Sequence, residues 1–191
     1  MRALSLIVFG LGICCVARAV AQQPKTVGAP ETFGAQARAE NADGAAVSAP
    51  IAIHVNRYTP EFDKKRIEEG LRVGGYPGFV TALRKGPDVG YVEVTRRRFT
   101  IRYAREVVSE KGRTIVVVTD KPMAFLGGSM SDSKPRAGYE VGAIELMVDG
   151  QGKGTGRMVA AARIKAGGET GVLIDNYAAD APIVLTNVTH Q

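Results

Sequence analysis

The densest group of side chains that could do chemistry is a run of arginines, Arg96, Arg97 and Arg98, with Arg102 four residues further on. Guanidinium groups bind carboxylates and phosphates with paired hydrogen bonds, so several on one rim would suit an anionic ligand. Cross-strand charge pairing is the other interpretation, because acidic residues near this run could neutralise it. These acidic residues are Glu93, Glu106 and Glu110.

Two glutamates occupy matching places in two similar segments, Glu93 in VGYVEV and Glu145 in VGAIEL. A pair of carboxylates in one cavity could act as general acid and base if one of them had a raised pKa. The pattern is more typical of exposed strand carboxylates, which have no catalytic role. A hydrolase acting through Glu93 and Glu145 is therefore one hypothesis among several.

Cysteine and histidine chemistry is scarce in this sequence. Cys14 and Cys15 both lie within an N-terminal segment that we expect to be removed, which would leave a cysteine-free mature chain without disulfides or a thiolate nucleophile. The two histidines are His54 and His190, too few to favour a transition-metal site. We expect neither a metal nor a cofactor.

The first 21 residues have the pattern of a signal peptide. Arg2 precedes an apolar run from Leu4 to Val16, which is too short to span a bilayer, and small residues allow cleavage after Ala19 or Ala21. The sequence therefore predicts a periplasmic or secreted protein with no transmembrane span in the mature chain. Lipoprotein anchoring is not expected, because Ile13 rather than a small residue precedes the first cysteine.

The whole chain has 25 Lys and Arg against 19 Asp and Glu, a formal net charge of +6. Removing residues 1–21 takes away two arginines and no acid, so the charge becomes +4. A mildly basic surface favours an anionic envelope component or a small ligand as the partner. Nucleic acid is not expected outside the cytoplasm.

Hydrophobic patterning predicts one α+β domain over residues 51–191, after a flexible linker at 22–50 that is rich in Ala, Gly and Pro. A strand at 51–56 and helices at 60–73 and 77–85 would precede strands at 89–189, joined by short connections that favour an antiparallel meander. About eight strands would form a barrel or β-sandwich. The expected later strands are Val89–Thr95, Arg98–Ser109, Arg113–Asp120, Met123–Gly127, Tyr139–Asp149, Thr155–Ala166, Gly171–Tyr177 and Ile183–Thr189.

Three segments, VTDKP (118–122), YEVGAIELMVDGQGKGTG (139–156) and IVLTNV (183–188), together resemble an uncharacterised family of exported bacterial proteins. The resemblance covers residues 51–191. It implies a leader, a linker, a helix pair and an antiparallel strand run, and it implies no activity, cofactor or catalytic residue.

Three functional hypotheses follow from the sequence. The first is a non-catalytic exported domain that binds a ligand or an envelope partner, through the mouth of a barrel or through the arginine-rich hairpin. The second is a carboxylate-based hydrolase of cell-wall or carbohydrate material. The third is a structural surface protein.

Overall fold

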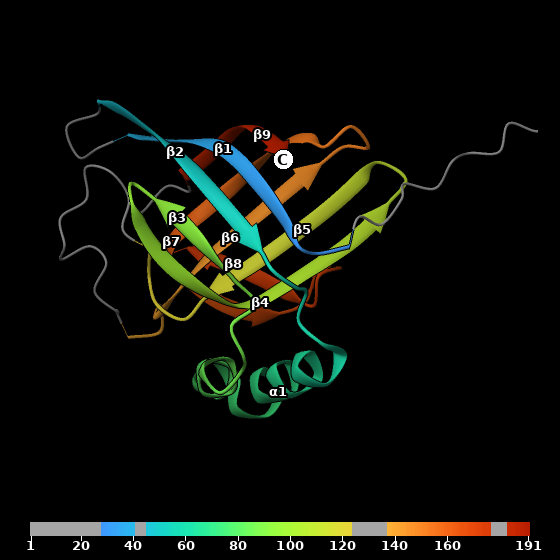
Figure 1. Ribbon diagram of the computed structural model, residues 1–191. Coiled ribbons are helices and arrows are strands. Elements are labelled where there is room, and N and C mark those ends of the chain that lie inside the picture. Colours follow the sequence, from blue (N-terminus) through green and yellow to red (C-terminus); the bar gives the residue numbers. More distant parts are fainter. Residues whose placement is uncertain (1–27, 41–44, 124–136, 177–182) are drawn as a thin grey trace, which may run out of the picture.

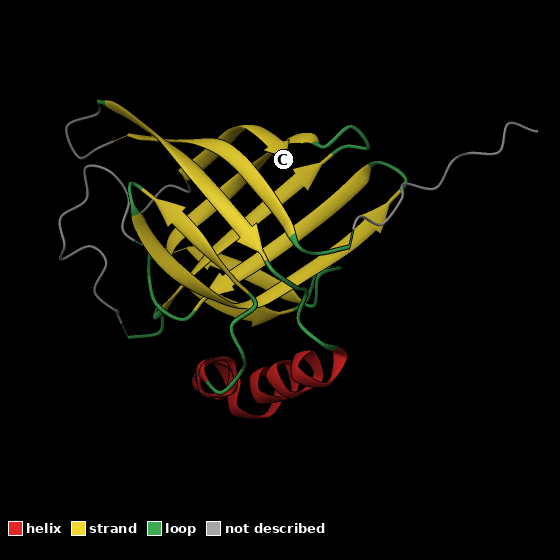
Figure 2. Ribbon diagram, in the orientation of Figure 1, coloured by secondary structure: helices red, strands yellow, loops and turns green. Residues whose placement is uncertain are grey.

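The computed structural model describes residues 28–40, 45–123, 137–176 and 183–191. The expected signal peptide and the expected strand Met123–Gly127 beyond its first residue lie outside the described residues. The described part of the chain holds nine strands and one helix (Figures 1 and 2). Their bounds are β1 (Glu31–Glu40), β2 (Ala46–Val55), α1 (Glu61–Arg84), β3 (Gly90–Val94), β4 (Arg97–Ser109), β5 (Gly112–Thr119), β6 (Val141–Val148), β7 (Lys153–Ala166), β8 (Val172–Asn176) and β9 (Ile183–His190).

The strands form a closed antiparallel barrel. Their order is β6-β5-β4-β3-β2-β1-β9-β7-β8, and an additional pairing of β6 with β7 closes the ring around eight of them. The ninth strand, β8, pairs with the second half of β7 and extends the sheet beyond the ring. This confirms the expected antiparallel fold and shows a barrel with an added helix.

The N-terminal strands correct one expectation from the sequence. Residues 31–40 and 46–50 were expected within a flexible linker, but they form β1 and the first half of β2. Phe33, Ala35 and Ala37 are buried and alternate with residues that face outward. Because most of the inward side chains are small, the alternation is weak in the sequence, and pairing with β2 and β9 decides the structure.

Apolar side chains fill the inside of the barrel. Ile51, Ile53 and Val55 of β2 face inward, as their alternation predicts, and pack with inward residues of the other strands in one buried cluster. Among its largest members are Phe33, Ile101 and Leu146. The described interior is therefore a packed core, and binding of a ligand has to take place at the ends or on the outside.

Helix α1 covers one side of the barrel (Figure 1). Its apolar residues, including Ile67, Phe79 and Leu83, pack on outward residues of β4, β5, β6 and β7 in a second buried cluster. The helix is interrupted at Gly75, which has φ 58° and ψ −154°, between the two expected helices. A glycine suits this backbone conformation because it has no side chain to clash.

Candidate functional site

The β3–β4 hairpin has a two-residue turn that presents the arginine run at one end of the barrel. Thr95 and Arg96 have φ of 49° and 64°, the double positive φ of a turn whose twist matches that of the flanking strands. Val94 pairs with Arg97 directly across this turn. Both turn residues and Arg97 are exposed, so the tip is a short, geometrically defined projection.

Because side chains alternate along a strand, Arg97 and Arg98 lie on opposite sides of β4. Arg97 shares the inner side with Phe99, whose ring is buried, and therefore stands at the opening of the barrel. Lys121 follows β5, and its Nζ lies 5.9 Å from the centre of the Phe99 ring. We call Arg96, Arg97 and Lys121 the basic mouth.

Arg98 belongs to a polar stack on the outer side of the barrel. Its Nε donates to Glu93 Oε2 over 2.9 Å, and its guanidinium lies 4.6 Å from the centre of the Tyr91 ring. Tyr91 stacks in turn on His54 at 4.3 Å. Arg98 therefore has partners on its own sheet, as the pairing interpretation expected.

Arg102 is likewise engaged by its neighbours. Its Nη1 donates to the carbonyl of Gly86 at 2.9 Å and lies 2.5 Å from a carboxylate oxygen of Asp88. Within the described residues, Arg96 and Arg97 make no such hydrogen bond or ion pair. The structure thus divides the predicted anion-binding set of Arg96, Arg97, Arg98 and Arg102 into two paired arginines and two available ones.

The two candidate catalytic glutamates are not brought together. Glu93 lies opposite Arg98 on β4, whereas Glu145 lies opposite Val116, which is itself opposite Arg105 on β4. Arg98 and Arg105 are seven residues apart, which is about 23 Å along that strand at about 3.3 Å per residue. Glycosidase carboxylates lie about 5–9.5 Å apart, so this pair does not have the required geometry.

Each of these glutamates has a basic partner instead. Glu93 accepts from Arg98, and Glu145 accepts from Arg157 Nε at 2.7 Å. Both lie on outward faces of their strands, the arrangement that the exposed-carboxylate interpretation expected. Within the described part of the chain, the strand pairing therefore does not bring Glu93 and Glu145 to one site.

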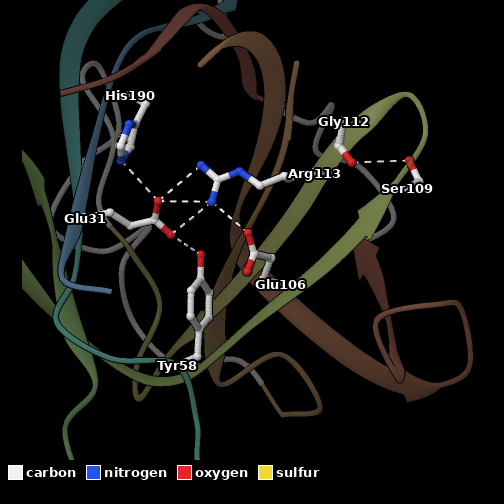
Figure 3. A network of polar contacts seen from close by, with 7 residues as sticks. All are labelled: Glu31, Tyr58, Glu106, Ser109, Gly112, Arg113 and His190. Atoms are coloured by element: carbon white, nitrogen blue, oxygen red, sulfur yellow. Dashed lines mark hydrogen bonds and ion pairs between the residues drawn. The ribbon is translucent and has the colours of Figure 1, made fainter. Parts of the chain in front are cut away.

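The opposite end of the barrel contains a buried ion cluster that the sequence analysis missed (Figure 3). Arg113 Nη1 donates to Glu106 Oε1 at 2.7 Å, and Arg113 Nη2 donates to Glu31 Oε2 at 3.2 Å. The Glu31 side chain is fully buried, and those of Arg113 and Glu106 are 5% and 8% exposed. The cluster consists of Glu31, Tyr58, Glu106, Arg113 and His190.

Two further groups complete this cluster. Tyr58 donates its hydroxyl hydrogen to Glu31 Oε1, and burial together with this hydrogen bond raises the pKa of the Tyr58 phenol. His190 Nε2 lies 3.2 Å from Glu31 Oε2, and its side chain is 25% exposed. A small recess of about 170 Å³, lined partly by Tyr58 and Glu106, borders the cluster.

The sequence offered only a weak signal for this cluster. Glu31, Arg113 and His190 are far apart in the chain, and they meet because β1, β5 and β9 are all brought to one end of the closed barrel. The one sequence pattern that indicates such a cluster is a charged residue at a strand position whose side chain is expected to face inward. Arg113 falls in the inward phase with Ile115 and Val117, as Glu31 does with Phe33.

The described residues contain no group of three or more His, Cys, Asp or Glu that could hold a metal ion. Among these described residues, no helix combines the length and the apolar character needed to cross a membrane. Comparison with protein-family models, curated proteins and solved structures finds no match to this chain.

Proposed function

We propose that this protein is a non-catalytic exported binding domain that holds an anionic component of the cell envelope at its basic mouth. The observation that carries the proposal is the exposure of Arg96 and Arg97 without a carboxylate partner among the described residues. Export rests on the signal-peptide pattern of residues 1–21. Membership of the exported family that the sequence resembles is part of the same proposal.

The neighbouring contacts support this choice of surface. Two other arginines of the hairpin already form ion pairs, Arg98 with Glu93 and Arg102 with Asp88. Their guanidinium groups are therefore less available to a ligand than those of Arg96 and Arg97. Arg96 lies in a turn whose backbone is fixed by two positive φ values, which limits the conformational entropy lost on binding. Lys121 adds a third positive charge beside the opening.

The chemistry of the partner follows from the guanidinium groups. Exposed arginines bind phosphate or carboxylate oxygens in pairs of hydrogen bonds, and each basic residue near an anionic surface contributes about 1 kcal/mol. Arg96 and Arg97 together would then contribute about 2 kcal/mol. That corresponds to roughly a 30-fold change in affinity.

Binding to vesicles containing phosphatidylglycerol tests the proposal, with phosphatidylcholine vesicles as the neutral reference. The double variant Arg96→Gln with Arg97→Gln should bind the anionic vesicles about 30-fold more weakly. A matched control, Lys65→Gln with Lys111→Gln, removes the same charge from α1 and from the β4–β5 turn and should bind like wild type.

A polymer arm separates the possible sources of the anion. The same variants are assayed with a soluble polyanion, such as a polyphosphate, in place of vesicles. Binding to both probes that depends on Arg96 and Arg97 supports recognition of the shared phosphate chemistry. Equal loss in the control pair would show a general effect of net charge and would overturn the proposal.

A further inference from the structure

The buried ion cluster at the far end of the barrel contains more acid than base. Glu31 and Glu106 bring two carboxylates, while Arg113 brings one guanidinium, and Tyr58 is a neutral donor. With a neutral His190, the cluster would hold one uncompensated negative charge among side chains that are almost fully buried. Burying such a charge is costly, so a proton bound within the cluster would stabilise it.

His190 is the group best placed to carry that proton. Its Nε2 faces Glu31 Oε2 at 3.2 Å, and this nitrogen is buried and accepts or donates no hydrogen bond among the described residues. The ring also contacts Phe33, with centroids 5.3 Å apart. Since its side chain is 25% exposed, it is the most accessible charged group of the cluster and can exchange a proton with solvent.

The groups around His190 come from every neighbouring element. Glu31 and Phe33 belong to β1, Arg113 to β5 and Glu106 to β4, while Tyr58 lies in the connection after β2. The β6–β7 turn contributes Gly152, whose carbonyl accepts from the backbone of His190 at 2.7 Å. The basic residue next in that turn, Lys153, pairs with Thr189 on the outward side and does not face the ring.

Because His190 lies at the end of β9, a proton on its ring affects how firmly this strand is held in the barrel. β9 is inserted between β1 and β7 and completes the ring. At its end the backbone of Gln191 donates to Thr32 on one side, as that of His190 does to Gly152 on the other. An attraction between His190 and Glu31 therefore holds the end of β9 to the start of β1, where the two strands pair.

We propose that the buried ion cluster is a proton-operated latch on the end of β9. With His190 protonated, the cluster is neutral and the end of β9 is held against β1. When His190 loses its proton, the cluster keeps a net negative charge and the end of β9 opens more often. The stabilising contribution is thus present while His190 carries its proton and is lost when a rise in pH removes that proton.

Amide hydrogen exchange of the segment 184–191, corrected for the intrinsic pH dependence of exchange, measures this opening. In the wild type, protection should fall about tenfold or more between pH 5 and pH 8, since the charge pair lies in a poorly solvated site. His190→Gln should remove the pH dependence. The matched control His54→Gln, which changes the histidine on the outer side of β2, should keep it.

Charge neutralisation gives a second arm. Glu31→Gln leaves one carboxylate for one guanidinium, so protection of the segment should become independent of pH. If Glu31→Gln does not fold, the variant Glu106→Gln makes the same change of charge and takes its place in the experiment. A wild type without pH dependence would overturn the proposal. So would a pH dependence that survives in His190→Gln, because a carboxyl group would then carry the proton.

Discussion

Arg113 is the residue on which the buried ion cluster depends. Its guanidinium donates to both Glu31 and Glu106, whose side chains are 0% and 8% exposed. Replacement by methionine keeps the apolar stem and leaves two carboxylates buried together without the guanidinium that pairs with both. Removing one partner of a buried ion pair costs about 3–5 kcal/mol. A domain of this size has a total stability of about 5–15 kcal/mol, so Arg113→Met should be severely destabilised.

Urea denaturation at pH 7 measures this loss from the shift of the midpoint. Arg113→Lys keeps the charge but loses the paired geometry, so it should lie between wild type and Arg113→Met. The matched control Arg98→Met removes an exposed ion pair with Glu93 and should cost no more than about 1 kcal/mol. A loss below about 1 kcal/mol in Arg113→Met would contradict this expectation, because it would mean that the two buried carboxylates do not need the guanidinium as a counter-charge.

Three further predictions concern the rest of the fold. Burial raises the pKa of Tyr58, Tyr76 and Tyr103, which favours their protonated forms in the folded state. Their contribution is complete below the ordinary tyrosine pKa of about 10 and is lost as pH rises above it, so urea midpoints should fall between pH 8 and pH 11, and less so in Tyr103→Phe. An unchanged wild-type midpoint would contradict this sign. A Cβ on Gly78 would lie 2.3 Å from the carbonyl oxygen of Gly70, so Gly78→Ala should cost about 1–3 kcal/mol, whereas Gly74→Ala, which meets no atom within 4 Å, should gain about 0.5–1 kcal/mol. Equal effects of the two alanines in thermal melts would show that the halves of α1 do not touch as described. Thr95→Asn should stabilise the β3–β4 turn by up to about 1 kcal/mol, because asparagine tolerates φ of 49° better than a β-branched residue, and an unaltered or lower melting temperature would count against the turn geometry.

The strands from β3 onward could be predicted because their patterns are strong. Branched and aromatic residues such as Val92, Phe99, Ile115 and Ile144 recur at every second position, and short polar connections separate the runs. The first strand could not be predicted in the same way, since Ala35 and Ala37 bury little apolar surface each. Its structure depends on pairing with β2 and β9, partners that lie near and very far in the sequence.

The candidate sites were predictable to different degrees. Arg96 and Arg97 could be predicted as candidates because the basic residues of the hairpin are consecutive in the sequence. Strand alternation explains why Arg98 lies on the outer side of the barrel instead. Pairing of Glu93 with Glu145 was not excluded by the sequence, because which strands become neighbours depends on closure of the whole sheet. The same closure assembles Glu31, Arg113 and His190, which no local pattern connects.

The binding proposal is tested most directly by mapping backbone amide chemical shifts while a soluble anionic probe, inositol hexaphosphate, is added. Saturable changes are expected only at residues 94–99 and 121, around the basic mouth. Amides near Lys65 on α1 and near Lys111 in the β4–β5 turn should not move. Changes spread over every basic segment, or centred on α1, would contradict the claim that Arg96 and Arg97 form the binding surface.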